Sequence, residues 1–231
     1  MKKGVIFYFT ITGLILISSY ILLGENFFSV SRSDRRILNF LILIVIVSVL
    51  LIYNIVLSTM LYSKNKKAEE SLKDFERYDI VWNKESMKER IEEIFFEVQK
   101  AWTARDQNLA KGSLTQKMFE EHKAKTDELI NSGVINMLES IKLIEAKIIS
   151  VADFKDDSKD VFSSHIKGKM INYIIDDKTK KLVSGDDKHY EPFEEIWHFK
   201  REGNKWMLNE IDQKVTIYSL LENSPEEKPL T

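Results

Sequence analysis

The sequence predicts an α+β domain carried by a membrane anchor, and three patterns along the chain support this prediction. First, two long apolar runs without a charged residue open the chain. Second, the apolar residues between Ser86 and Asp106 recur at spacings of three and four, which is the period of an amphipathic helix. Third, from Val134 onward apolar and polar residues alternate as they do in strands. Helices followed by an antiparallel sheet are the α+β order of elements.

The composition excludes several classes of function. The 231 residues suffice for one domain of ordinary size and an additional anchor. The formal net charge of -2 argues against a general affinity for nucleic acid, because binding to its backbone requires an excess of basic residues. The chain contains no cysteine, which rules out disulfides, thiolate nucleophiles and cysteine-based zinc sites.

Residues 1–62 are expected to form a membrane anchor of two transmembrane helices, 4–23 and 37–62. At about 1.5 Å per residue, each run is long enough to cross a hydrocarbon core of roughly 30 Å. A cleaved signal peptide is the alternative for the first run, but the run is long for one and no A-x-A-like cleavage site follows it. Lysines flank the predicted hairpin on one side and arginines occupy its loop: Lys2, Lys3, Lys64, Lys66 and Lys67 against Arg32, Arg35 and Arg36. The positive-inside rule then places both termini and the soluble domain in the cytoplasm.

The charged segment 63–77 follows the second span and contains neither glycine nor proline. This composition predicts a helical linker that extends the span, although a solvated tether is the simpler alternative. Its three lysines, Lys64, Lys66 and Lys67, are candidates for contact with anionic lipid headgroups. They serve equally well as residues that only fix the topology.

The segment from Ser86 to Asp106 is the best-defined helix of the soluble part. Ser86 and Glu89 fit a capping box at its start. Phe96 does not fit the apolar stripe, because at about 100° per residue it lies roughly 140° from Ile91. Either a second helix covers Phe96, or Phe96 marks a surface for a partner.

A short helical turn and a second long helix are expected next. Asp106 is expected to cap the turn and Thr115 the helix, which Gly133 then closes. His122 lies within the apolar stripe of this second helix. A hydrogen-bonded histidine in the core explains that position more simply than a functional histidine does.

The remainder of the domain, which is predicted to span 78–222, reads as strands separated by polar turns. Residues 223–231 contain two prolines and several acids and are expected to form a disordered tail. The expected strands are 138–154, 160–176, 181–186, 192–201 and 205–213.

Sequence motifs offer little support for catalysis. The glycines are isolated, so there is neither a dinucleotide fingerprint nor a phosphate-binding loop, and the histidines do not have zinc-ligand spacing. We therefore expect no metal and no cofactor. A carboxylate and a histidine can act as general acid and base, and His165 with Asp106 or Glu195 is the pair to consider. Hydrogen bonds at the edge of the sheet explain these residues more simply, so the chain is not expected to be an enzyme.

Five segments in a fixed order resemble a known domain family. They are IEEIFFEVQKAWTARD from Ile91, LTQKMFEEH from Leu114, GVINMLESIKLIEAKIISV from Gly133, GKMINYIID from Gly168 and FEEIWHFKREGNKWMLNEIDQ from Phe193. Together they resemble the C-terminal domain of subunit forty-four of the mitochondrial inner-membrane translocase, in a form similar to that of bacterial membrane-anchored proteins. The resemblance covers roughly 78–221.

The resemblance implies a fold like that of nuclear transport factor two, in which helices pack into a curved antiparallel sheet and form a cone with an apolar pocket. It also implies a tethering role at a membrane, because the mitochondrial protein holds a chaperone motor at the translocation channel and contacts cardiolipin-containing membrane. The N-terminal part differs from the mitochondrial protein, which puts recruitment of a chaperone in doubt. The residues that match the family pattern are implied to be core or pocket positions rather than catalytic ones: Phe95, Trp102, Asp106, Asn136, Trp197, Phe199 and Trp206.

These observations favour a non-catalytic, membrane-anchored adaptor or scaffold that binds a protein partner or anionic lipid at the membrane surface and functions in protein translocation or the assembly of a membrane complex. Two alternatives remain. One is a protein or enzyme that binds a small hydrophobic ligand in the cone pocket, because fold alone does not decide function. The other is an extracytoplasmic component of a secretion or conjugation complex.

Overall fold

The computed structural model describes residues 32–222 of the chain. The first predicted span, 4–23, and the predicted disordered tail, 223–231, lie outside the described residues. The chain divides into two compact units, Met1–Ser58 and Thr59–Thr231, and the division falls within the first described helix, α2.

Helix α2, Arg32–Phe75, supplies the described part of the first unit. Among residues 32–222 it is the one helix that is long and apolar enough to cross a membrane, and it contains the predicted span 37–62. Its apolar side chains are exposed, as they are in a helix that faces lipid; Ile52 is 61% exposed. The amide of Asn54 donates to the carbonyl oxygen of Leu50 at 2.8 Å, so the helix itself provides an acceptor for this polar side chain.

The C-terminal part of α2 belongs to the second unit and packs into its core. Ala68 and Leu72 are buried in one apolar cluster with residues of the helices and the sheet. The side-chain amide of Asn65 donates to the carbonyl oxygen of Ile148 at 2.8 Å. The segment 63–77, predicted as a linker, is thus helical through Phe75, and it contributes two residues to the core of the domain.

Helix α3, Lys84–Ala104, carries the apolar stripe that the sequence predicted. The carboxamide oxygen of Asn83 accepts a hydrogen bond from the backbone amide of Ser86 at 2.9 Å and caps the helix. The predicted capping box of Ser86 and Glu89 is therefore wrong, because the helix begins two residues before Ser86. The buried residues of α3 recur at spacings of three and four, with Gln99 at the edge of the stripe: Met87, Ile91, Ile94, Phe95, Val98, Gln99 and Ala101.

The two predicted caps that follow are confirmed. Asp106 caps the short 3-10 helix η3, Gln107–Ala110, by accepting from the amide of Asn108 at 3.1 Å. Thr115 caps α4, Gln116–Asn131, by accepting from the amide of Met118 at 3.4 Å. The chain leaves α4 through Gly133, whose φ of +66° is a conformation that glycine adopts without strain.

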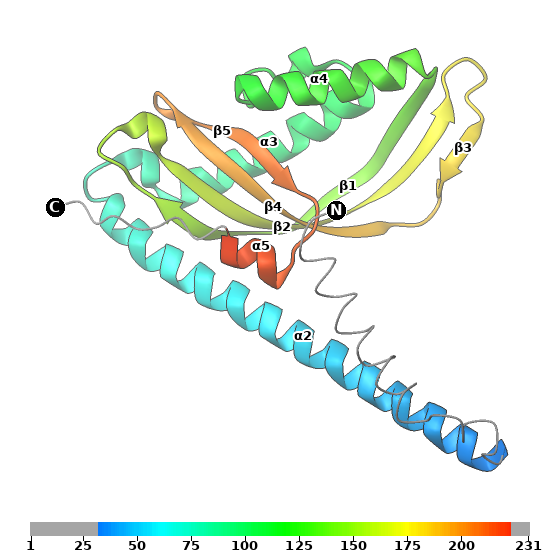
Figure 1. The fold of residues 1–231 in the computed structure, drawn as a ribbon. Helices are drawn as coiled ribbons and strands as arrows, with labels where there is room; N and C mark the ends of the chain where they lie inside the picture. Colours follow the sequence, from blue (N-terminus) through cyan, green and yellow to red (C-terminus); the bar gives the residue numbers. More distant parts are fainter. Residues whose placement is uncertain (1–31, 223–231) are drawn as a thin grey trace. The chain divides into compact units, whose positions relative to one another are not determined.

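Helices α3 and α4 cover one face of a five-stranded antiparallel sheet, and α5 lies on its other side (Figure 1). The main path of the sheet is β1-β2-β4-β5, and β3 pairs with β2 beyond it. The α+β prediction is thus confirmed, and each predicted strand has a counterpart. The sequence did not predict α5, Ile217–Glu222, in which Leu220 is buried. The strands are β1 (Val134–Ala152), β2 (Val161–Asp176), β3 (Leu182–Gly185), β4 (Glu191–Glu202) and β5 (Lys205–Asp212).

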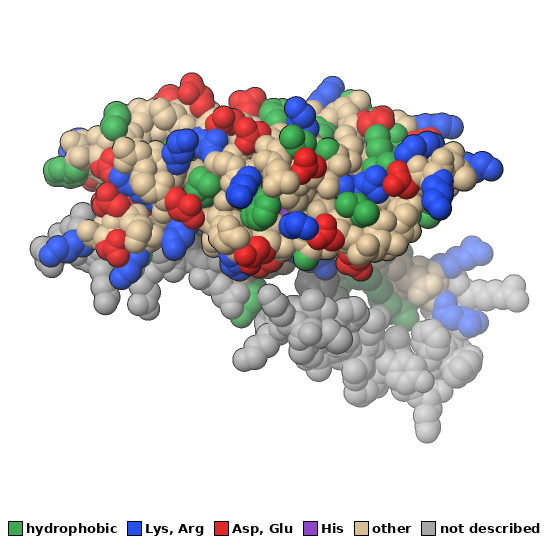
Figure 2. All heavy atoms as spheres, turned by 90° about the horizontal axis from the view of Figure 1, so that it is seen from above, with side chains coloured by type: hydrophobic (Ala, Val, Ile, Leu, Met, Phe, Trp, Pro, Cys, Tyr) green, Lys and Arg blue, Asp and Glu red, His purple; other side chains and the backbone are tan. Residues whose placement is uncertain are grey.

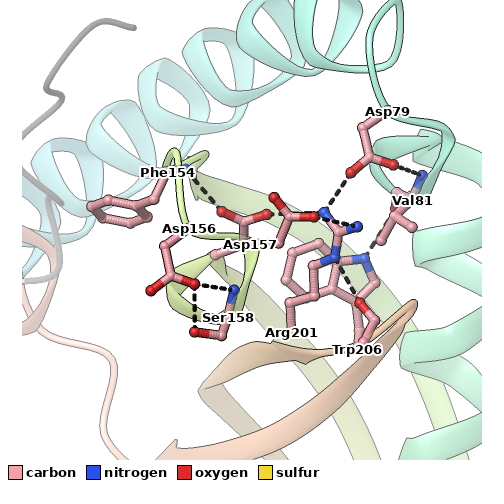
Figure 3. Close-up of polar contacts among 10 residues, drawn as sticks. Asp79, Val81, Phe154, Asp156, Asp157, Ser158, Arg201 and Trp206 are labelled. Atoms are coloured by element: carbon pink, nitrogen blue, oxygen red, sulfur yellow. Dashed lines mark hydrogen bonds and ion pairs between the residues drawn. The ribbon is translucent and has the colours of Figure 1, made fainter.

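The guanidinium of Arg201 on β4 ties together three segments that are distant in sequence (Figure 3). It binds Asp79, which precedes the 3-10 helix η2 (Ile80–Trp82), and it lies 3.2 Å from Asp157 in η4 (Asp157–Lys159). It also lies 3.1 Å from the carboxylate of Asp160, which is fully buried, and its Nε donates to the carbonyl oxygen of Gly203 at 2.8 Å. Burial raises the pKa of Asp160, while the hydrogen bonds from the Phe154 amide and Arg201 counter that rise.

The Arg201→Met substitution is predicted to destabilise the domain. It leaves the buried Asp160 without a cation, a loss that costs about 3–5 kcal/mol in comparable buried pairs and corresponds to a fall in Tm on the order of 10 °C. Thermal unfolding of the full chain in detergent micelles, followed by near-ultraviolet circular dichroism, measures this fall. Lys200→Met, at the adjacent exposed position on β4, is the matched control and is expected to leave Tm within about 2 °C. Equal Tm values for the two variants would contradict the role assigned to Arg201.

Candidate functional site

A cleft of 560 Å³ lies between the two helices and the sheet, and we call it the helix–sheet cleft. Its volume falls within the range of about 300–1,000 Å³ that is typical of ligand sites. Helices α3 and α4 form one wall, and strands β1, β2, β4 and β5 form the other. Residues toward its interior include Val98, Gln99, Trp102, Met118, His122, Asn136, Leu138, Phe193 and Glu195.

Gly168 on β2 shapes the wall of this cleft. A Cβ atom at this position would lie 2.4 Å from Cζ of Phe193, the residue opposite it on β4. The absence of a side chain therefore lets the Phe193 ring lie over β2. There it stacks on Phe95 of α3, with 6.2 Å between the ring centroids.

A chain of hydrogen bonds crosses the cleft from α3 to the sheet. The indole Nε1 of Trp102 donates to the carboxamide oxygen of Asn136 on β1 at 2.8 Å. The Asn136 amide donates to the carboxamide oxygen of Asn172 on β2 at 2.7 Å, and the Asn172 amide donates to Glu191 on β4 at 3.2 Å. The structure thus brings together Trp102 and Asn136, two of the residues expected from the family pattern.

The other residues of that pattern lie outside the cleft lining. Phe95, Trp197, Phe199 and Trp206 are buried in the apolar core beneath it. Asp106 caps η3 instead of contacting the cleft. Phe96, for which two explanations were open, is 41% exposed and packs edge-on against Phe95 with 5.2 Å between the ring centroids.

Glu195 is a partly buried carboxylate in the cleft. It shares a face of β4 with Trp197, whose indole Nε1 donates to its carboxylate at 2.8 Å. Burial raises the pKa of Glu195, and the bond from Trp197 offsets only part of that rise. Alternation along EEIWHF carried the signal for this position, because residues two apart on a strand share a face.

His122 on α4 is buried in the same cleft, at 6% exposure. Its ring lies edge-on to Trp102, with 5.4 Å between the ring centroids. Its Nδ1 has no hydrogen-bond partner among residues 32–222, so the expectation of a hydrogen-bonded core histidine is not met at this atom. Burial, and secondarily the charge of Lys125, lower the pKa of His122 to about 4. The imidazole is therefore neutral at physiological pH.

The acid–base pair considered from the sequence is not formed. In the β2–β4 register His165 lies opposite Ile196, and its ring bonds to Glu194 at 3.1 Å. Glu194 and Glu195 are neighbours on one strand and point to opposite faces of the sheet. His165 and Glu195 are thus separated by the sheet, and Asp106 is engaged in its cap.

A second groove, of 790 Å³, lies between η2, the N-terminal half of α3 and the β4–β5 hairpin. Arg90 extends into it, but its guanidinium bonds to the carbonyl oxygens of Trp206 at 3.1 Å and Gly112 at 3.0 Å, and to Glu93 at 2.6 Å. The charge of this groove is therefore used within the protein. No group of three or more histidines and carboxylates suited to a metal ion occurs within the described range.

Comparisons with known proteins identify a family and little else. The family model described as "Tim44-like domain" matches residues 68–213. No curated protein matches the chain. Among solved structures, the crystal structure of the intermembrane space region of the chloroplast protein ARC6 is similar with a TM-score of 0.38 and 11% identity, over 55% of this chain and 95% of that chain. Similarity at this level supports no inference about function.

Acid is predicted to destabilise the domain partly through His122. Its pKa of about 4 in the folded state lies below the model value of 6.5, so folding disfavours its proton. The stabilising contribution is complete above pH 6.5 and is lost as the pH falls toward 4, by up to about 3 kcal/mol.

His122→Leu removes this titration while keeping an apolar contact with Trp102. The Tm difference between the wild type and His122→Leu, measured in micelles from pH 7.5 to pH 4, is expected to shift in favour of the variant as the pH falls. His189→Gln, at an exposed position, is the control and should follow the wild-type curve. A pH-independent difference between the wild type and His122→Leu would contradict the assignment.

Proposed function

The chain belongs to the Tim44-like domain family, and from this premise we propose that it is a non-catalytic membrane-anchored adaptor. Tim44-like domains bind proteins and membranes and are generally non-catalytic. In this proposal α2 anchors the chain, and the second unit presents a binding domain at the membrane surface. We further propose that this unit, with two helices over a sheet whose strand β1 contains three irregularities in register, is a cone of the nuclear-transport-factor-two type.

The continuity of α2 is the observation that supports this proposal best. One uninterrupted helix contains the apolar stretch and the two buried core residues Ala68 and Leu72. Only five residues separate Tyr62, the last residue of the apolar stretch, from Ala68. A helix that folds into the domain so soon after the apolar stretch leaves no flexible tether between the two, which suits a scaffold.

Anionic lipid is the second partner in this proposal. Lys66 and Lys67 are exposed and Lys64 is half-buried, and all three directly follow the apolar stretch. Each basic residue near an anionic membrane surface contributes about 1 kcal/mol to binding. The two spans and these lysines together favour the cytoplasmic side for the domain.

A ligand-binding role is a second candidate function, and the helix–sheet cleft favours it. Trp102 lines the cleft, as a ligand pocket would require, whereas Trp197 and Phe199 are buried beneath it. The cleft is an open site with several polar groups and not a closed apolar cavity. It is therefore better suited to a partly polar ligand than to a purely hydrophobic one.

Topology reporters fused after Thr231 test the cytoplasmic placement in a bacterial host. We expect a reporter that is active only in the cytoplasm to be active, and a reporter that is active only in the periplasm to be inactive. The same fusions on a chain without residues 1–31 provide a control, because removal of the first span reverses the expected side. Activity of the periplasmic reporter on the full chain would support the extracytoplasmic alternative instead.

Phe96 is predicted to belong to a protein-binding surface. The Phe96→Ser substitution removes a side chain that is 41% exposed, so we expect the free energy of unfolding to fall by no more than about 1–2 kcal/mol. A photo-crosslinker at Glu92, which is exposed and one turn away on α3, should capture a partner in cells with Phe96 and lose it with Phe96→Ser. A crosslinker at exposed Glu202 provides the control for non-specific capture. An unchanged crosslink in the Phe96→Ser background, or an unfolded variant, would show that Phe96 is not a partner contact.

A further inference from the structure

The carboxylates that line the helix–sheet cleft outnumber its cations. The carboxylates are Glu121, Glu191, Glu195, Glu210 and Asp212, and the only ammonium groups are those of Lys117 and Lys125. The whole chain is nearly balanced, with 34 basic and 36 acidic residues. Acidic and basic side chains are also interspersed over the described part of the face that carries α4 (Figure 2). The excess of acid is thus a local property of the cleft.

Glu195 is the carboxylate whose charge is least compensated. Lys117 lies 3.2 Å from Glu210, and the Asn172 amide binds Glu191, so these two acids have partners. Glu195 accepts one hydrogen bond, from the neutral indole of Trp197, and no lysine or arginine among residues 32–222 forms an ion pair with it. Partial burial of a carboxylate without a cation costs free energy, and that cost falls if a cation enters the cleft.

His122 supplies a second, independent indication of a ligand. It is more than nine-tenths buried, it lines the cleft, and its Nδ1 has no partner among the described residues. Buried ring nitrogens normally have a hydrogen-bond partner. Because the ring is neutral near pH 7, it does not repel a cation, and it can offer a lone pair to a donor.

The walls of the cleft also suit a cation with an apolar stem. Trp102 and Phe193 expose aromatic surface to it, and the faces of aromatic rings attract ammonium groups. Val98 and Leu138 add aliphatic surface on the helix and strand sides. An alkyl chain that ends in an ammonium group matches this combination of aromatic and aliphatic walls with an uncompensated carboxylate.

We propose that the helix–sheet cleft binds a primary ammonium group carried on an alkyl stem, with Glu195 as its counter-ion and His122 Nδ1 as a hydrogen-bond acceptor. The group belongs either to a small free amine or to a lysine side chain of a protein partner. This inference rests on the ligand-binding role proposed for the cleft, and it does not depend on a partner surface at Phe96.

Calorimetric titration of the full chain in detergent micelles at pH 8 tests the proposal with n-pentylammonium chloride. Saturable binding is expected, with n-pentanol at least about tenfold weaker because it has the same stem without the charge. Glu195→Gln should weaken n-pentylammonium binding about tenfold or more, and His122→Phe by a smaller factor. Glu202→Gln, which removes an exposed carboxylate at the end of β4, is the matched control and should leave binding unchanged.

A peptide arm identifies the source of the ammonium group. Binding of acetyl-Gly-Lys-Gly-amide, with loss of binding when norleucine replaces its lysine, would indicate a lysine of a partner; binding of n-pentylammonium alone would indicate a free amine. Equal binding of n-pentylammonium and n-pentanol, unaffected by Glu195→Gln, would overturn the cation while leaving a ligand-binding cleft in place. Absence of binding by every probe would overturn both. In selectively ¹³C-labelled protein, the His122 ring signals should shift with n-pentylammonium, and an unchanged spectrum at saturation would contradict the role of Nδ1.

Discussion

The buried guanidinium of Arg201 connects parts of the domain that the chain would otherwise leave independent. It joins the approach to α3, through Asp79, to the β1–β2 turn, through Asp157 and Asp160. The planar, permanently charged fork of arginine can serve several acceptors at once, which an ammonium group does less well. The entry to α3 and the edge of the sheet are therefore held at a fixed separation. Trp206 adds to this link by donating its indole N–H to the carbonyl oxygen of Val81 at 3.0 Å.

The periodic parts of this fold were predictable from the sequence, and the connections between them were not. The stripe of α3 and the caps Asp106 and Thr115 follow from local spacing, which survives in any tertiary context. The start of α3 was missed because Asn83 competes with Ser86 as a cap, and only the observed bond decides between them. The turn 153–160 was expected to be an exposed polar hairpin. The burial of Asp160 depends on Arg201, which lies 41 residues further along the chain, and no local pattern reports that contact.

The candidate site shows the same division. Trp102 and Asn136 were identified through the family pattern, and the structure joins them directly. The roles of Glu195 and His122 depend on which face each side chain occupies, and a shift of one residue in register moves a side chain to the opposite face of the sheet. His165 illustrates this sensitivity, because the register directs it to Glu194 and away from Glu195. Exposure of Phe96 likewise depends on where α4 ends relative to α3, and the sequence does not fix that packing.

Two groups of acids in this domain carry opposite implications. At Arg201 an excess of carboxylates surrounds a cation that the chain itself supplies, so the arrangement is explained by the stability of the fold. At the helix–sheet cleft the uncompensated carboxylate of Glu195 and the free nitrogen of His122 face a space that the chain leaves open. A hydrophobic pair at these two positions would pack at lower cost, since neither group gains a charged partner within the described residues. Stability of the fold therefore does not account for Glu195 and His122, and a ligand with complementary charge does.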